Sequence, residues 1–203
     1  MKRDTQEEKL RLGEIAFVRS GLVLSRKESK DQTRYSYPLL NLRAVLPNGT
    51  IDLSKIDTFI AKEALDTEYL AREGDIIIRL SQPYTAVMID EATSGLVISS
   101  YFAIIRPDSR LLLPEYLFWL MNTPKVKQEI FENTSSNMMG AIKPKFFADF
   151  DLTLLPLANQ QKIADLHATA RKEIQLLHDL ADAKEKYYAQ TIDQIQKKMR
   201  KQR

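Results

Sequence analysis

The chain contains no cysteine and only two histidines among its 203 residues. Without cysteine it can form no disulfide, no thiolate nucleophile and none of the usual structural zinc sites. His167 and His178 are separated by eleven positions, which on a helix places them about 16 Å apart, too far to bind one metal ion. We therefore expect no metal site in this chain.

Glycine is also scarce, with six residues in the whole chain. The sequence has no Gly-rich phosphate-binding loop, no Rossmann fingerprint and no Asn-Pro-Pro-Tyr-like motif of amino-methyltransferases. A nuclease-like set can be assembled from Asp108, Asp182 and Lys184, but such common residues at loose spacing occur by chance in most charged proteins. We expect neither catalytic residues nor a bound cofactor.

Long apolar runs are missing as well. No stretch reaches the roughly eighteen apolar residues of a membrane-spanning helix, and residues 1–9 are polar and mixed in charge, without an apolar signal core. The expected location is the cytoplasm.

Residues 1–156 have the pattern of a mixed α/β (α+β) domain. Short segments rich in Val, Ile, Tyr and Phe alternate with turn formers. The strand candidates are residues 15–18, 22–24, 37–45, 76–80, 85–89 and 96–105. Helices are predicted over 114–122 and 123–133, each with a proline in its first turn.

Residues 157–203 differ in kind, because from Asn159 to about Lys201 there is neither Gly nor Pro and helix formers dominate. One helix of about 60 Å is predicted. Apolar side chains recur with the helical period and form one stripe. The stripe consists of Ile163, Leu166, Ala170, Ile174, Leu177, Ala181, Tyr188, Ile192, Ile195 and Met199. A rod of this length needs a partner helix, so we expect an antiparallel coiled coil with a second copy of the chain.

Four polar stretches of the α/β region are candidates for DNA contact. Reading a DNA sequence requires hydrogen-bonding side chains on exposed loops, beside cations that neutralise phosphates. The region as a whole is slightly acidic, so any one of these stretches could equally be a solvated turn. The candidates are Arg19, Ser20, Lys27, Lys30 and Arg34 in the first stretch, Arg79, Ser81, Gln82 and Tyr84 in the second, Ser100 and Tyr101 in the third, and Ser135, Asn137, Lys143 and Lys145 in the fourth.

Four short motifs follow one another along the chain. Residues 12–16 (LGEIA) with 19–21 (RSG) resemble the opening of the target recognition domain in the specificity subunits of type I restriction-modification systems. Residues 74–79 (GDIIIR) are similar to its "GDI" strand and 113–117 (LPEYL) to its "PEYL" helix start. Residues 155–163 (LPLANQQKI) resemble the junction to its spacer helix, although Ala158 and Asn159 stand where the family often has acidic residues.

The resemblance implies a non-catalytic subunit that binds double-stranded DNA and docks methyltransferase subunits. S-adenosylmethionine would then belong to the methyltransferase partner, and restriction subunits, when present, would supply cleavage. Family members usually hold two recognition domains and two spacer helices, whereas this sequence has one of each and no internal repeat. It therefore resembles a half-length form, which we expect to act as a homodimer on a bipartite site.

Two other functions stay open at this point. A coiled-coil adaptor that uses the same fold for protein contacts would fit the acidic balance and the strong helix stripe. A stand-alone nuclease would rest only on the scattered carboxylates described above.

Overall fold

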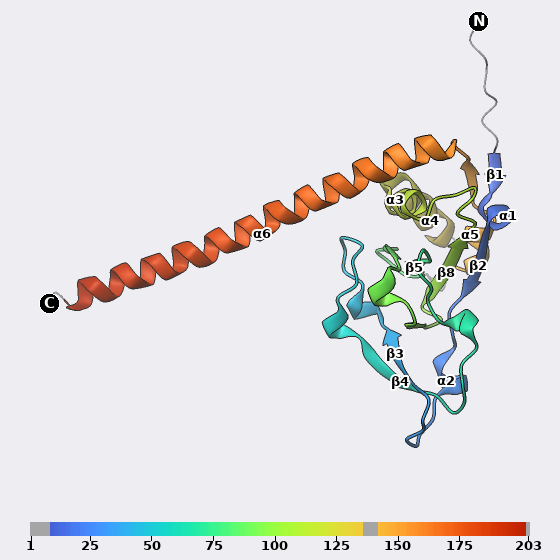
Figure 1. The fold of residues 1–203 in the computed structure, drawn as a ribbon, viewed down its shortest axis with the longest axis horizontal. Coiled ribbons are helices and arrows are strands. Elements are labelled where there is room, and N and C mark those ends of the chain that lie inside the picture. The colour runs from blue at the N-terminus through green and yellow to red at the C-terminus, as the bar shows by residue number, and fades with distance from the viewer. Residues whose placement is uncertain (1–8, 136–141, 202–203) are drawn as a thin grey trace, which may run out of the picture. The chain divides into compact units, whose positions relative to one another are not determined.

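A computed structural model of the chain describes residues 9–135 and 142–201, except for the side chains of residues 135 and 201. It divides into two compact units, Met1–Gln161 and Lys162–Arg203. The first unit is a mixed α/β body and the second is part of one long helix (Figure 1). The predicted fold class is confirmed in both respects.

The centre of the body is a four-stranded antiparallel sheet in the order β2-β8-β5-β6. Its strands are β2 (Ala16–Ser20), β5 (Ile76–Arg79), β6 (Ala86–Met88) and β8 (Phe102–Pro107). All three consecutive isoleucines of β5 are fully buried. Side chains alternate between the two faces of a strand, so both faces of this sheet are covered.

A second, three-stranded sheet in the order β4-β3-β7 supplies one of these covers. It contains β3 (Ser36–Leu40), β4 (Asp57–Ile60) and β7 (Val97–Ile98). Leu40 and Ile98 of this sheet pack with Ile77, Phe102 and Ile104 of the first sheet in one hydrophobic cluster. The main core therefore lies between the two sheets.

Helices contact the central sheet as well. Helix α3 (Pro114–Asn122) packs against β5 and β6, and α5 (Pro144–Ala148) packs against β2. Helix α4 (Pro124–Ser135) follows α3 directly, so both helices predicted between residues 114 and 133 are confirmed. Shorter pieces complete the body: α1 (Leu12–Ile15), α2 (Leu24–Lys27), the antiparallel pair β1 (Lys9–Arg11) with β9 (Asp151–Thr153), and 3₁₀ turns at Leu42–Ala44, Leu53–Lys55, Thr67–Tyr69 and Glu91–Thr93.

Three strand predictions were wrong in detail. The segment 96–105 is not one strand, because a turn in which Phe102 N donates to Ser99 O (3.0 Å) divides it into β7 and β8, which belong to different sheets. Residues 22–24 form no strand, because Leu22 makes a single bridge to Ser99 and α2 begins at Leu24. The segment 37–45 stops being a strand at Leu40, because the Asn41 side chain accepts a hydrogen bond from the Ala44 backbone N–H (3.0 Å) and starts a 3₁₀ turn.

Helix α6 (Leu157–Lys201) runs for 45 residues and confirms the predicted long helix. Its first turn belongs to the body, where the Gln160 side chain is fully buried. Gln160 accepts a hydrogen bond from Leu113 N (2.9 Å) and donates to the carbonyl oxygens of Leu111 (2.9 Å) and Leu155 (2.8 Å). Since a buried amide needs such partners, Gln160 fixes the start of the helix. Among the described residues, no helix is long and apolar enough to cross a membrane.

One buried ion pair closes an end of the central sheet. Asp75, just before β5, is fully buried and accepts hydrogen bonds from Nε and Nη2 of Arg106 in β8, both at 2.7 Å. It also accepts from the Arg72 backbone N–H at 2.9 Å. The carboxylate therefore ties two neighbouring strands to the turn that precedes β5.

Asp75→Asn should lower the free energy of unfolding by about 3 kcal/mol, because it removes the charge that compensates the partly buried Arg106. Urea unfolding measures the change. Asp108→Asn is the matched control, since its partner Arg110 is almost fully exposed and the loss of that pair should leave the urea midpoint unchanged. Equal effects of the two substitutions would contradict this account of Asp75.

Candidate nucleic-acid interface

The register of the central sheet brings several predicted loops to one end. Ser20, the last residue of β2, lies opposite Ala103, and Arg79, the last residue of β5, lies opposite Phe102. Strand β8 begins at Phe102. Because β8 is antiparallel to both neighbours, the segments after β2 and β5 meet the segment before β8.

Backbone hydrogen bonds hold these segments together. Leu80 N donates to Tyr101 O (3.0 Å), Gly21 N donates to Phe102 O (3.0 Å), and Ile142 N donates to Leu80 O (3.1 Å). A Cβ atom at Gly21 would lie 2.2 Å from Ser99 O, so only glycine allows this approach. We call residues 19–22, 79–85, 99–102 and 142–143 the loop end of the sheet.

Hydrogen-bonding side chains are displayed at the loop end. Ser20 and Gln82 are exposed, Ser81 and Ser100 are partly exposed, and the Tyr101 side chain is 63% exposed. These are five of the predicted DNA-contact residues, and they come from three separate stretches of the sequence. The loop end can therefore offer donors, acceptors and one aromatic ring to a ligand.

Two predicted lysines follow directly. Lys143 is exposed at the start of α5. Lys145 is exposed in α5, with a long contact of 4.0 Å to Asp149, which leaves its charge available to another anion. Of the other two candidates in this stretch, Asn137 and the side chain of Ser135 lie outside the described part of the chain.

The sequence suggested that Tyr84 is exposed and contacts DNA, but the structure places it in the interior. Its side chain is only 4% exposed, and its φ of 53° is in the left-handed region that non-glycine residues rarely adopt. The Tyr84 hydroxyl lies 2.9 Å from Thr134 Oγ1 at the end of α4. Thr134 donates to backbone carbonyls of its own helix, so Tyr84 is the donor. Tyr84 thus anchors the β5–β6 loop and is not available to a ligand.

Arg19 is also engaged within the body, although it lies in β2. Its guanidinium forms an ion pair with Glu68 and lies 4.2 Å from the centre of the Tyr69 ring. Both partners belong to the 3₁₀ turn Thr67–Tyr69, which is far from Arg19 in the sequence. Arg19 therefore joins that turn to the sheet.

The remaining basic candidates lie beside the three-stranded sheet. Lys27 forms an ion pair with Glu63, which raises the pKa of the lysine. Lys30 is exposed and, with Lys62, lines a shallow polar hollow. Arg34 donates to the hydroxyl of Tyr35 (2.7 Å) and lies 4.9 Å from the centre of its ring. The sequence had grouped all three with Ser20, but the backbone hydrogen bonds that join the segments of the loop end do not include them.

The hydroxyl groups of two further residues of the loop end, Thr85 and Ser99, are buried and have no hydrogen-bond partner among the described residues. Ser99 belongs to the candidate stretch that contains Ser100 and Tyr101, whereas Thr85 was missed. Thr85 is a short polar residue within a predicted strand, so its sequence gave no sign that it would be buried without a partner.

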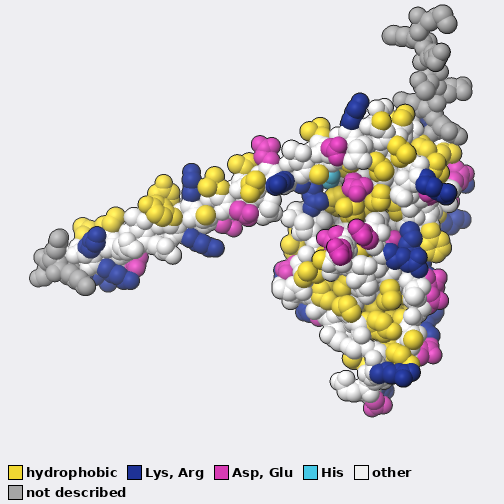
Figure 2. All heavy atoms as spheres, viewed as in Figure 1, with side chains coloured by type: hydrophobic (Ala, Val, Ile, Leu, Met, Phe, Trp, Pro, Cys, Tyr) yellow, Lys and Arg dark blue, Asp and Glu magenta, His cyan; other side chains and the backbone are white. Residues whose placement is uncertain are grey.

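All ten residues of the predicted stripe lie in α6. Its large side chains are 53–72% exposed from Leu166 onward, and Figure 2 shows hydrophobic side chains at intervals along the helix. These exposed residues are Leu166, Ile174, Leu177, Tyr188, Ile192, Ile195 and Met199. Ala181 is exposed, and Ile163 and Ala170 are partly exposed.

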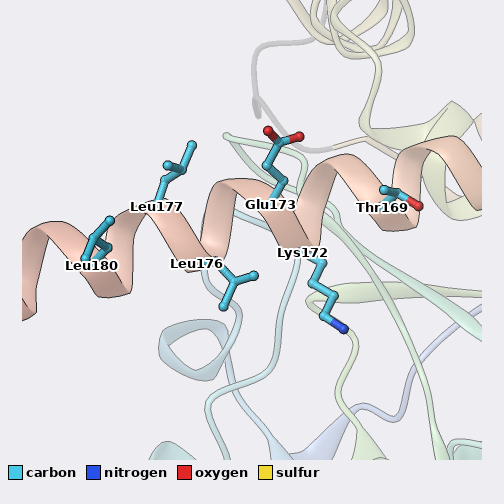
Figure 3. A pocket seen from close by; sticks show the side chains of 6 residues that line it. All are labelled: Thr169, Lys172, Glu173, Leu176, Leu177 and Leu180. Carbon is cyan, nitrogen blue, oxygen red and sulfur yellow. The ribbon is translucent and has the colours of Figure 1, made fainter.

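A second apolar row on α6 was not predicted. Leu176, Leu180 and Tyr187 are each more than half exposed, and their spacing of four and seven places them on one side of a helix. Figure 3 shows Leu176 and Leu177 projecting from different sides of α6, with Leu180, Thr169, Lys172 and Glu173 around a shallow hollow. The helix therefore presents two apolar rows.

No group of three or more His, Asp or Glu side chains in residues 9–135 and 142–201 is arranged to hold a metal ion. The arrangement at the loop end suits binding through hydrogen bonds and charge.

Solved structures with the same fold come from type I restriction-modification systems. A chain from a study of complex assembly and conformational transition of the type I R-M system is 19% identical, with a TM-score of 0.65, over 87% of this chain and 45% of that chain. The HsdS subunit from Thermoanaerobacter tengcongensis is 18% identical, with a TM-score of 0.63, over 89% of this chain and 46% of that subunit. The chain thus spans about half the length of the structures it matches. No protein-family model and no curated protein matches it.

At these identities the likeness shows the fold alone. The chain has the fold of half of an HsdS-type subunit, with one mixed α/β domain and one long helix. The resemblance indicated by the sequence motifs is confirmed at that level.

Tyr84→Phe should lower the free energy of unfolding by about 1 kcal/mol, because it removes a buried hydrogen bond. Tyr101→Phe removes a hydroxyl from an exposed ring and should leave stability unchanged. Thermal unfolding of both variants measures the difference. Equal thermal midpoints for the two variants would show that the Tyr84–Thr134 hydrogen bond does not stabilise the loop.

Proposed function

We propose that the chain is the sequence-specific DNA-binding subunit of a type I restriction-modification system, in a half-length form. Residues 1–156 act as the target recognition domain, and residues 157–203 act as the spacer and dimerisation helix. The observation that carries the proposal is the meeting of separate polar loops at one end of the sheet, in a chain with an HsdS-type fold.

The loop end has the two kinds of side chain that DNA recognition needs. Ser20, Ser81, Gln82 and Ser100 carry hydroxyl or amide groups that can pair with base edges, and the Tyr101 ring can contact a thymine methyl group or a sugar. Lys143 and Lys145 supply charge for phosphates. Ser135 and Asn137 stay in the proposed set on their sequence position alone. Lys27, Lys30 and Arg34 are proposed as flanking phosphate contacts.

A homodimer through α6 is the second part of the proposal. Each exposed large side chain of the stripe favours burial by about 1.5–3 kcal/mol, so a rod that displays seven of them is stabilised by a partner. The stripe is also self-complementary. In an antiparallel pair about residue 179, the midpoint of Leu157–Lys201, the facing pairs are Ile163 with the partner's Ile195, Leu166 with the partner's Ile192, Ala170 with the partner's Tyr188, and Leu177 with the partner's Ala181.

Twofold symmetry sets the form of the DNA target. An antiparallel dimer carries one recognition domain at each end of the helix pair. Two identical domains related by a twofold axis should bind two inverted copies of one half-site, with a spacer whose length is set by the rigid helices.

The chain is proposed to have no catalytic activity of its own. Methyl transfer from S-adenosylmethionine is assigned to methyltransferase subunits, and cleavage to a restriction subunit where one is present. The row Leu176, Leu180 and Tyr187 lies outside the proposed dimer stripe and offers a surface on which methyltransferase subunits can dock. A cytoplasmic location is part of the same proposal, because the protein would act on chromosomal DNA.

Replacing Lys143 and Lys145 by Ala should weaken binding to every duplex alike. Each lost phosphate contact lowers the slope of log K against log salt by about 1. Fluorescence anisotropy over a salt series measures the slope. Lys125→Ala is the control, since Lys125 is exposed at the opposite end of α4 from Thr134 and should not alter the slope. An unchanged slope in the double variant would remove these lysines from the interface, and no DNA binding by the wild-type chain would favour the adaptor.

The double substitution Leu177→Asp with Ile192→Asp should produce monomers, because two charges then face the partner helix. The recognition domain should stay folded. Binding to a bipartite site should fall at least about 100-fold, as the second domain no longer acts on the same DNA. Sedimentation velocity measures the mass.

The matched control is a separate double variant, Gln175→Asp with Gln190→Asp. Both glutamines are exposed and lie on the side of the helix opposite the stripe. This variant should remain dimeric. A wild-type chain that sediments as a monomer at micromolar concentration would contradict the homodimer.

A further inference from the structure

Arg79 occupies the boundary between the hydrophobic cluster and the loop end. It shares a face of β5 with Ile77 and lies opposite Phe102, and both of those residues belong to the cluster between the sheets. On its other side, Arg79 N donates to Thr85 O at 3.1 Å. As the last residue of β5, Arg79 is where the apolar face of the strand gives way to the loops.

The Arg79 guanidinium has no partner in the described part of the body. Three arginines there are partly buried: Arg19, Arg79 and Arg106. Arg19 is paired with Glu68 and Arg106 with Asp75, whereas Arg79 has a buried Nε that makes no hydrogen bond. A partly buried cation without a partner is costly to the folded protein. A ligand that accepts hydrogen bonds from the terminal nitrogens of the guanidinium would compensate its charge.

Its neighbours have the same property. Among the described residues, three buried side-chain nitrogen or oxygen atoms lack a hydrogen-bond partner, and they belong to Arg79, Thr85 and Ser99. All three residues are in the loop end. Ser99 O accepts a hydrogen bond from Phe102 N at 3.0 Å, and Phe102 lies opposite Arg79. The buried side-chain polar atoms that lack a partner in the described part of the body thus all belong to residues of the proposed DNA-binding surface.

We propose that Arg79 reads a guanine in the major groove of each half-site, donating two parallel hydrogen bonds to O6 and N7. This inference rests on the proposed function, namely that the loop end binds duplex DNA. The planar fork of arginine matches the two acceptors on the guanine edge, which no other base presents. Arg79 is partly buried and lies opposite Phe102 on the same face of the sheet, and a side chain with less rotamer freedom suits a directed base contact. The exposed lysines, being flexible point charges, suit phosphates.

The test compares the wild-type chain with Arg79→Met in selection from randomised duplexes. Methionine retains an unbranched apolar side chain without the charge or the fork. The wild-type chain should select a guanine at one position of each half-site, and the variant should lose that preference by about 5- to 150-fold. Arg26→Met is the matched control, because Arg26 is exposed in α2 and its loss should leave the preference unchanged.

A change on the DNA side tests the contact directly. Replacing the selected guanine by 7-deazaguanine removes the N7 acceptor and leaves the Watson–Crick pair intact. Wild-type binding should weaken by about tenfold, in line with the loss of one base contact. Arg79→Met binding should not change. A loss of the same size in both proteins would overturn the proposal.

Thermal unfolding distinguishes a role of Arg79 in base recognition from a role in stabilising the fold. If Arg79 is an uncompensated buried cation, Arg79→Met should raise the thermal midpoint, whereas a structural arginine would lower it. A lower midpoint in the variant contradicts the proposal, and so does an unchanged guanine preference, while DNA binding itself stands in both cases. A wild-type chain that selects no sequence would instead defeat the proposed function, and this inference with it.

Discussion

The antiparallel pairing of β8 with both β2 and β5 is the constraint on which the rest of the structure depends. It places Ser20 beside Ala103 and Arg79 beside Phe102, so residues 83 and 23 positions apart in the sequence become neighbours. A shift of the register by one residue would move Ser20 and Arg79 away from these partners and separate the loops. The same pairing places Asp75 and Arg106 together at the other end of the sheet.

The two ends of the sheet therefore differ in how their polar groups are satisfied. At one end a buried carboxylate has three hydrogen-bond donors, all within 2.9 Å. At the loop end, Arg79, Thr85 and Ser99 have buried polar atoms without hydrogen-bond partners in the part of the chain that the structure describes. The first end is stabilised by paired groups, whereas the second end has polar groups that a ligand can bind. This difference is expected when a rigid scaffold carries a recognition surface. Gln160 extends the scaffold into the first turn of α6.

Sequence reasoning succeeded where the signal was local. The period of α6, the prolines that start α3 and α4, and the isoleucine run of β5 predicted those elements nearly as they are. It failed where a distant residue decides the outcome. Tyr84 was predicted to be exposed and to contact DNA because its loop is polar, yet its hydroxyl forms a hydrogen bond with Thr134, 50 positions away. Arg19 was expected to contact DNA, but its guanidinium pairs with Glu68 and lies 4.2 Å from the centre of the Tyr69 ring. The second row on α6 was missed because a single stripe already accounted for the helical period.

The central claim is that the loop end is the surface that binds duplex DNA, and hydrogen exchange with and without a selected duplex tests it most directly. The account predicts that DNA slows exchange of the backbone amides at residues 20–22, 80–85 and 99–102, while those of residues 72–75 and 106–111, at the opposite end, exchange as before. Protection at the Asp75 end alone, or no change at any of these amides when the duplex is bound, would contradict it.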